Sequence, residues 1–110
     1  MSLARGEIYL VSLPPGKDPK RARALVVASR QTLCDSKADK LICAPINTEA
    51  DGRSTEVPVG IEDGLKHNSV INCDQLVLVE KSRLTNYVGS LSSKKLAGLR
   101  DALRIALDIE

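Results

Sequence analysis

The sequence predicts a single, mainly β domain that ends in one α-helix. Short apolar runs separated by turn-forming residues occupy most of the chain, which is typical of strands joined by loops. After Ser92 the apolar residues recur every three or four positions instead, which indicates a helix. A chain of 110 residues buries only roughly two-thirds of the surface that its unfolded form exposes, enough for one core. We therefore expect one domain over residues 1–110, with no linker or internal repeat.

The first strand is expected over residues 7–13, where EIYLVSL is rich in β-forming side chains and precedes a Pro-Pro-Gly turn. The continuously apolar run at 25–28 is typical of a strand buried on both faces. Residues 54–59 alternate, which places the odd-numbered side chains on one face. The other strands are expected at residues 41–46, 69–73, 75–79 and 87–90. Short strands at this spacing favour a sandwich or a barrel.

The C-terminal helix is expected to begin at Ser92, a residue type that caps helix N-termini well. Its buried stripe is predicted to contain Leu96, Leu99, Leu103, Ile105, Ala106 and Leu107. The basic residues of the opposite face are interpreted as plain solvation; they are Lys94, Lys95, Arg100 and Arg104. The helix should therefore pack against the strands through aliphatic side chains.

The aromatic content is very low, because Tyr9 and Tyr87 are the chain's two aromatic residues. The core must be aliphatic, and base stacking is disfavoured as a means of holding nucleic acid. The cysteines are odd in number and lack zinc-ligand spacing. Cys43 and Cys73 lie in apolar runs and should be core residues, whereas Cys34 is expected in a partly exposed loop. With no signal-peptide pattern and no membrane-spanning stretch, we expect a reduced cytoplasmic protein.

The net charge is only +2, so the distribution of charge is more informative than its sum. Lys17, Lys20, Arg21 and Arg23 lie within seven residues and are interrupted by Asp18. Such a cluster could form an anion-binding loop. It could equally be a solvated turn.

Three segments resemble one known family: RGEIYLV at 5–11, GLKHNSVINCDQ at 64–75 and KSRLTNYVGSLS at 81–92. Together they are similar to the MazF/PemK toxins, relatives of CcdB whose members mostly cut RNA. The resemblance implies a small SH3-like β-barrel of the CcdB/PemK type with a C-terminal amphipathic helix. It also implies a homodimer that cleaves single-stranded RNA at a short sequence without metal or cofactor. An acidic antitoxin protein would be its inhibitor.

Metal-free RNA cleavage needs a base for the ribose 2′-hydroxyl, donors for the phosphorane charge and an acid for the leaving oxygen. Acid–base assistance contributes roughly 10²–10⁴-fold, and fixed donors a comparable amount. His67 is the chain's one histidine, which excludes a two-histidine mechanism. It is interpreted as an RNA-binding residue of a loop or, alternatively, as an ordinary surface residue.

Arg23 is the main catalytic candidate, because it resembles the arginine of the family's Arg-Pro signature. The resemblance implies that it contacts the scissile phosphate and assists proton transfer, and a planar guanidinium suits the first task. The proline is replaced here by Ala24, and Arg21 offers a second alignment two residues earlier. Arg23 could also be a simple charge at a strand edge.

The second catalytic position is expected in the segment ICAPINTE. Asn47 best matches the family's threonine, and Thr48 follows one residue later. A shift of one residue can move a side chain to the other face of a strand. Either Thr48 acts through a bulge, or Asn47 binds phosphate without a hydroxyl, or both belong to a turn.

Further RNA contacts are expected from the basic loop and from the end of the second matching segment, residues 64–75. In the loop, Asp18, Lys20 and Arg21 are candidates, and Asp18 could also orient Arg23 or simply be solvated. Asp74 and Gln75 match an acidic-Gln pair of the family, which implies RNA contact for Asp74. Gln75 is interpreted as a buried structural residue.

Two other interpretations keep the same fold but assign the protein a function without catalysis. The protein could be a CcdB-like inhibitor of DNA gyrase, or a degenerate paralogue that binds antitoxin and cleaves nothing. Asn47, Asn72 and Ala24 favour these readings, because they replace residues of the family pattern. The C-terminal sequence LDIE lacks Trp, which counts against gyrase inhibition. An unrelated SH3-like module leaves the third matching segment unexplained.

Overall fold

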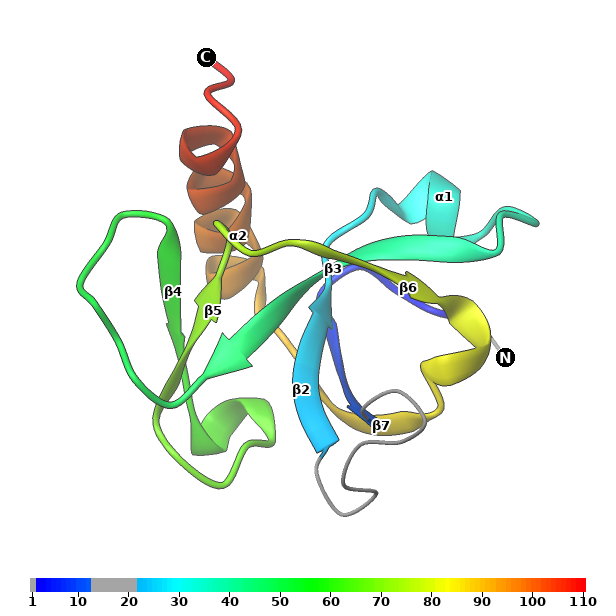
Figure 1. The fold of residues 1–110 in the computed structure, drawn as a ribbon, viewed down its shortest axis with the longest axis horizontal. Coiled ribbons are helices and arrows are strands. Elements are labelled where there is room, and N and C mark those ends of the chain that lie inside the picture. The colour runs from blue at the N-terminus through cyan, green and yellow to red at the C-terminus, as the bar shows by residue number, and fades with distance from the viewer. Residues whose placement is uncertain (1, 13–21) are drawn as a thin grey trace.

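The computed structural model of the chain describes residues 2–12 and 22–110 (Figure 1). It is mainly β, as predicted, with one long C-terminal helix and three short helical turns. The strands are β1 (Glu7–Ser12), β2 (Ala22–Val27), β3 (Lys40–Asn47), β4 (Glu56–Val59), β5 (Ser69–Asn72), β6 (Val77–Glu80) and β7 (Asn86–Ser90). The helical elements are α1 (Gln31–Cys34), η1 (Ile61–Asp63), η2 (Lys81–Arg83) and α2 (Ser93–Ala106).

The strands form one curled antiparallel sheet in the order β4-β5-β3-β2-β1-β7. Strand β3 lies at the centre of the sheet, and one of its edges pairs with two different strands. Its first half, Lys40–Cys43, pairs with β6, and its end, Ile46–Asn47, pairs with β5. The sheet therefore bends around β3 into a half-barrel, and α2 packs on the side of β4 and β5 (Figure 1). This bend confirms the predicted barrel-like architecture.

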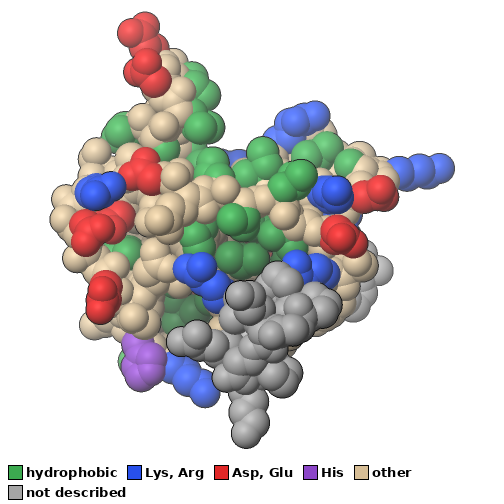
Figure 2. Space-filling view, viewed as in Figure 1, with side chains coloured by type: hydrophobic (Ala, Val, Ile, Leu, Met, Phe, Trp, Pro, Cys, Tyr) green, Lys and Arg blue, Asp and Glu red, His purple; other side chains and the backbone are tan. Residues whose placement is uncertain are grey.

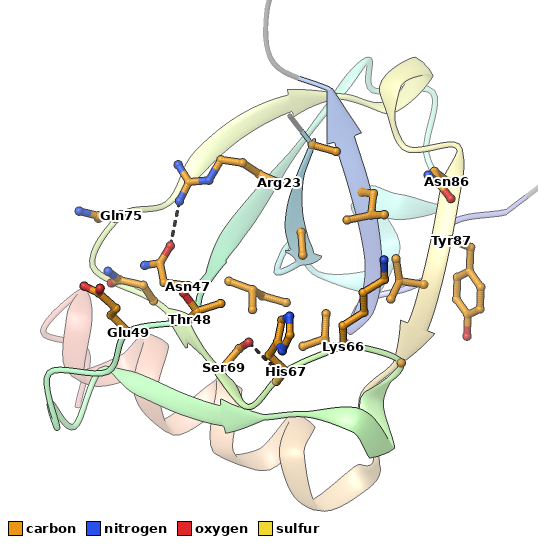
Figure 3. Close-up of a pocket in the computed structure, with 18 of the residues that line it drawn as sticks. Arg23, Asn47, Thr48, Glu49, Lys66, His67, Ser69, Gln75, Asn86 and Tyr87 are labelled. Carbon is orange, nitrogen blue, oxygen red and sulfur yellow. Dashed lines mark hydrogen bonds between the residues drawn. The ribbon is translucent and has the colours of Figure 1, made fainter. Parts of the chain in front are cut away.

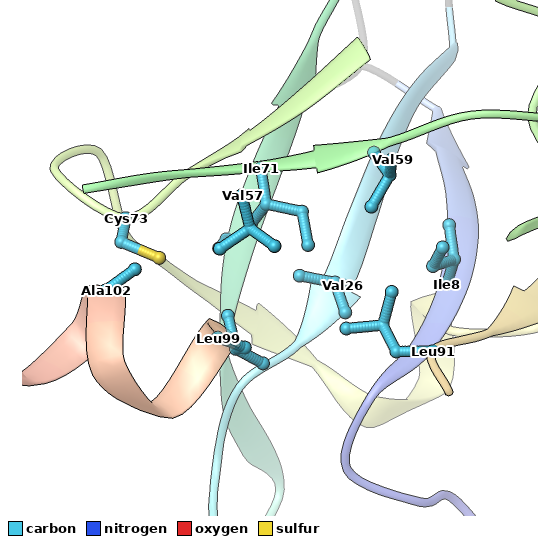
Figure 4. Packing of buried hydrophobic residues seen from close by; sticks show 10 residues of the cluster. Ile8, Val26, Val57, Val59, Ile71, Cys73, Leu91, Leu99 and Ala102 are labelled. Atoms are coloured by element: carbon cyan, nitrogen blue, oxygen red, sulfur yellow. The ribbon is translucent and has the colours of Figure 1, made fainter. Parts of the chain in front are cut away.

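Two aliphatic clusters lie on the two faces of the sheet. One packs against α2 and contains Val26 and Leu99, and its side chains converge as shown in Figure 4. The other contains Leu25 and Val27 together with Tyr9. Neighbouring residues of β2 therefore enter different clusters, which confirms that this strand is buried on both faces. Truncating a fully buried residue such as Leu99 to Ala typically destabilises a protein by about 2–5 kcal/mol.

Helix α2 begins where the sequence predicted. The side-chain oxygen of Ser92 accepts a hydrogen bond from the Lys95 N–H at 3.3 Å, which caps the helix. Its last turn projects beyond the sheet (Figure 1). For this reason Ile105 and Leu107 are 54% and 55% exposed, and their predicted burial is wrong. No helix in the described part of the chain is long and apolar enough to cross a bilayer.

The cysteines differ from the prediction at one position. Cys43 and Cys73 are core residues, as expected, and burial raises the pKa of their thiols to about 12 and about 11. Cys34 was expected in a partly exposed loop, but it ends helix α1 and is buried. Burial likewise raises the pKa of Cys34. The short helix turns this side chain inward, which the sequence pattern of residues 30–39 did not reveal.

Candidate active site

An open groove of about 980 Å³ lies across one face of the half-barrel (Figure 3). It is formed where strands end and loops begin, and polar and apolar side chains share its lining about equally. Four segments contribute most of its lining: 22–24 at the start of β2, 46–49 at the end of β3, 64–67 after η1, and 86–88 in β7. We call this depression the groove.

Arg23 and Asn47 meet at one end of the groove. The Arg23 Nη2 donates a hydrogen bond to Asn47 Oδ1 at 2.8 Å. Strand register explains the contact: Leu25 pairs with Pro45 in the antiparallel β2–β3 ladder, so two residues further out Arg23 lies opposite Asn47. Both residues were candidates from the sequence, and the structure brings them together in one groove, while their catalytic roles stay predictions.

Within residues 2–12 and 22–110, the Arg23 guanidinium uses only one of its hydrogen-bond donors. It has five N–H donors in a planar fork, and one of them is used by Asn47. The side chain is exposed and lines the groove. It is therefore held at one atom and can still present donors to a phosphate.

Thr48 also lines the groove, although it is one residue beyond Asn47. Strand β3 ends at Asn47, so the alternation of faces no longer applies to Thr48. Both candidates for the second catalytic position are thus within the same groove, but the guanidinium contacts Asn47. Glu49 and Asp51 line the groove too, and neither was predicted from the sequence as a site residue.

His67 and Lys66 lie on the opposite wall, in the segment after η1, and their side chains extend toward the groove in Figure 3. The His67 backbone carbonyl accepts a hydrogen bond from Ser69 Oγ at 3.0 Å, which ties the segment to β5. Figure 2 shows the histidine at the edge of the molecule beside a basic side chain. Lys66 was not predicted as a site residue, although its place next to His67 was a usable signal.

Asp74 and Gln75 are placed differently from the prediction. Asp74 does not line the groove: its Oδ2 accepts a hydrogen bond from Thr55 Oγ1 at 2.6 Å and lies 3.8 Å from Arg53 Nη1. Its carboxylate therefore fastens the turn before β4 to the end of β5. Gln75, which was interpreted as buried, is exposed and lines the groove. The four-residue connection between β5 and β6, residues 73–76, points these neighbours in different directions.

Asp18, Lys20 and Arg21 lie outside the described residues, so their predicted RNA contacts stay predictions. The alternative alignment on Arg21 stays open for the same reason. Within residues 2–12 and 22–110, no three His, Cys, Asp or Glu side chains gather in a way that could hold a metal ion.

Comparison with known proteins identifies the family. The profile described as PemK-like, MazF-like toxin of type II toxin–antitoxin system matches residues 4–107. A protein from Mycobacterium tuberculosis named endoribonuclease MazF3 is 29% identical over 90 residues, which cover 82% of this chain and 86% of that protein.

Solved structures agree. The Mycobacterium tuberculosis toxin MazF-mt6 superposes with a TM-score of 0.81 at 27% identity, covering 94% of this chain and 98% of that one. A mycobacterial endoribonuclease in complex with its cognate antitoxin has the same fold, with a TM-score of 0.84 at 21% identity over 99% and 98% of the two chains. The match along nearly the whole sequence and the shared fold place this chain in the family of PemK-like, MazF-like toxins of type II toxin–antitoxin systems.

Proposed function

We propose that this protein is an endoribonuclease toxin that cleaves single-stranded RNA at a short sequence, without a metal ion. The contact between Arg23 and Asn47 in the groove is the observation that carries the proposal. Family membership supports it, as does the similarity to a protein named endoribonuclease. The catalytic residues are Arg23 and a partner at position 47 or 48.

In this reaction the ribose 2′-oxygen attacks the neighbouring phosphorus and displaces the 5′-oxygen of the next nucleotide. The products are a 2′,3′-cyclic phosphate and a 5′-hydroxyl. Arg23 binds the non-bridging oxygens with donors that Asn47 leaves open, and so stabilises the charge that develops in the transition state. The Thr48 hydroxyl, or the Asn47 amide, supplies a second hydrogen bond at the same end of the groove.

The opposite wall binds the RNA chain. Lys66 and His67 can contact phosphates beyond the cleavage point, because they line the groove from a different segment. Glu49 and Asp51 repel phosphate but can accept hydrogen bonds from base amino groups, which gives this end of the groove a means of reading sequence. Gln75, with both donor and acceptor groups, can serve the same purpose.

The working form is a homodimer in this proposal. Ile42 and Leu78 lie opposite each other on the paired strands β3 and β6, and they are 43% and 64% exposed. Val77 extends this apolar surface, and Figure 2 shows hydrophobic side chains gathered there. An acidic antitoxin segment would cover the cations of the groove, in keeping with the antitoxin complex of the similar mycobacterial endoribonuclease.

The test is incubation of the pure protein with a mixed-sequence RNA, followed by mapping of the new 5′ ends with and without EDTA. We expect 5′-hydroxyl ends at one recurring sequence, unchanged by EDTA and absent with Arg23→Ala. A requirement for metal would contradict the proposed reaction. Absence of cleavage together with tight binding of an antitoxin would instead identify a degenerate paralogue, and inhibition of DNA gyrase would identify a CcdB-like protein.

A further inference from the structure

A buried ion pair outside the groove anchors the wall that carries Lys66 and His67. Asp63 ends η1 just before this wall segment, and its side chain is only 3% exposed. Its Oδ2 accepts a hydrogen bond from the Gly60 N–H at 2.9 Å and lies 2.5 Å from Lys95 Nζ on α2. A carboxylate buried this deeply needs a cationic partner, because an unpaired charge away from water is strongly destabilising.

Lys95 is engaged by two carboxylates at once. Its Nζ also donates to Glu62 Oε1 at 2.7 Å. The hydrogen bond to Asp63, followed by that to Glu62, raises the pKa of Lys95 above its usual range. A lysine in the first turn of a helix is disfavoured by the helix dipole. Its place there is explained by its contacts to η1 and not by helix stability, which corrects its predicted role as a solvated surface charge.

Strand β7 holds the same turn from another side. A Cβ atom at Gly89 would lie 2.0 Å from the Asp63 carbonyl oxygen, so the two backbones touch directly. Gly64 has φ +96°, and a Cβ there would lie 2.3 Å from the Val88 carbonyl oxygen. The turn is thus held between helix α2 and strand β7, with no space in which to shift.

We propose that Lys95 is a positioning residue for the groove. By fixing Asp63 it fixes the turn that leads into Gly64, and so it sets where Lys66 and His67 stand. Helix α2, which lies outside the groove, thus determines where the RNA-binding side chains of the wall are placed. Only this consequence for RNA binding rests on the proposed function.

His67 makes this testable, because it is the only histidine and its imidazole C–H signals in a proton NMR spectrum report on the wall alone. The variant is Lys95→Met, and the matched control is Lys94→Met at the neighbouring exposed position. We expect Lys95→Met to shift and broaden the His67 signals in the absence of RNA, while Lys94→Met leaves them unchanged. Lys95→Arg, which keeps the charge, should restore the wild-type signals.

The second measurement uses a single-stranded RNA that carries the mapped cleavage site. At a temperature where every variant is folded, Lys95→Met should lower kcat/KM about 10- to 100-fold, and Lys94→Met should not. Lower thermal stability with unchanged His67 signals and unchanged kcat/KM would overturn the proposal and leave a purely structural ion pair. If Lys95→Met does not fold, Asp63→Asn replaces it, because it removes the carboxylate charge that Lys95 binds: shifted His67 signals support the proposal, and unshifted signals overturn it. A failure of the proposed nuclease function would appear separately, as lack of cleavage by the wild type.

Discussion

The two sides of the groove are built in opposite ways. At one end, Arg23 is exposed and meets Asn47 through a single hydrogen bond between neighbouring strands. At the other, the segment that carries His67 follows a turn locked by the buried Asp63–Lys95 pair and by backbone contact with Gly89. The proposed catalytic group, Arg23, can therefore adjust its position toward a phosphate. The wall proposed to bind the RNA chain is already fixed before the RNA binds. Fixed binding groups lose little conformational entropy when substrate arrives.

The largest effect should come from the exposed end. Arg23→Ala is expected to reduce RNA cleavage by at least about 100-fold, because a donor aimed at developing negative charge is worth roughly 10²–10³-fold. The melting temperature should change little, since the side chain is exposed. Cleavage assays and thermal unfolding measure both. Arg30→Ala, at an exposed position outside the groove, is the control. Full activity in Arg23→Ala would show that another arginine performs the task.

Overpacking the turn that holds the fixed wall should lower the stability of the protein. Gly89→Ala places a methyl group 2.0 Å from the Asp63 carbonyl oxygen, and overpacking of this kind destabilises a protein by about 1–3 kcal/mol. Gly98→Ala is the matched control, because its Cβ would meet only Val57 Cγ1 at 3.6 Å in the interior of α2. That change should stabilise the protein by up to about 1 kcal/mol. Urea unfolding distinguishes them, and equal effects would mean that the turn is not tightly packed.

The choice between Asn47 and Thr48 sharpens the description of the exposed end. Because Asn47 orients the guanidinium, Asn47→Ala should lower cleavage about tenfold, by removing one hydrogen bond to a charged group. Thr48→Ala should match or exceed this loss if its hydroxyl contacts the phosphate. Single-turnover cleavage rates decide the matter. Wild-type rates in both variants would place the second catalytic group elsewhere.

The smallest effect is expected in the loop at residues 51–53, which Glu56 holds through its carboxylate. Glu56 is half-buried and accepts hydrogen bonds from the backbone N–H groups of Asp51, Gly52 and Arg53 at 3.1, 2.9 and 3.1 Å, which lower its pKa. A lowered pKa adds stability above the unfolded-state value of 4.5, and this stability is lost as pH falls through the folded-state pKa. From about pH 6 to about pH 3, the wild type should therefore lose more melting temperature than Glu56→Gln.

Glu49→Gln is the control for this measurement, because among the described residues the Glu49 carboxylate accepts no backbone hydrogen bond. Parallel pH profiles for the wild type and Glu56→Gln would show that the carboxylate does not hold the loop.

Patterns within single elements predicted the fold well. The apolar run of β2 indicated burial on both faces, and the change of period after Ser92 indicated α2 and its cap. These features depend on residues a few positions apart, so local sequence contains them. The exposed positions of Ile105 and Leu107 depend instead on where the sheet ends beneath the helix, which no local pattern records.

The site was predicted only where a strand or motif positioned it. Arg23 and Asn47 face each other because they lie on adjacent antiparallel strands. The resemblance to the MazF/PemK family had indicated both residues. Lys95 could not be found in this way, because its partner lies 32 positions earlier in the chain and only the packing of α2 on η1 brings them together. The prediction that Gln75 is buried was wrong, because Gln75 lies in the irregular connection 73–76 between β5 and β6 and not in a continuous strand.

The two tyrosines have a practical consequence for optical work on this molecule. They face each other across β1 and β7, with ring centroids 5.9 Å apart and planes at 73°. Because the sequence contains no Trp, all intrinsic ultraviolet emission arises from this one contact. Fluorescence will therefore follow the pairing of the first strand with the last, which are the strands farthest apart in sequence. It will be nearly insensitive to the aliphatic cluster that packs against α2, which contains no tyrosine.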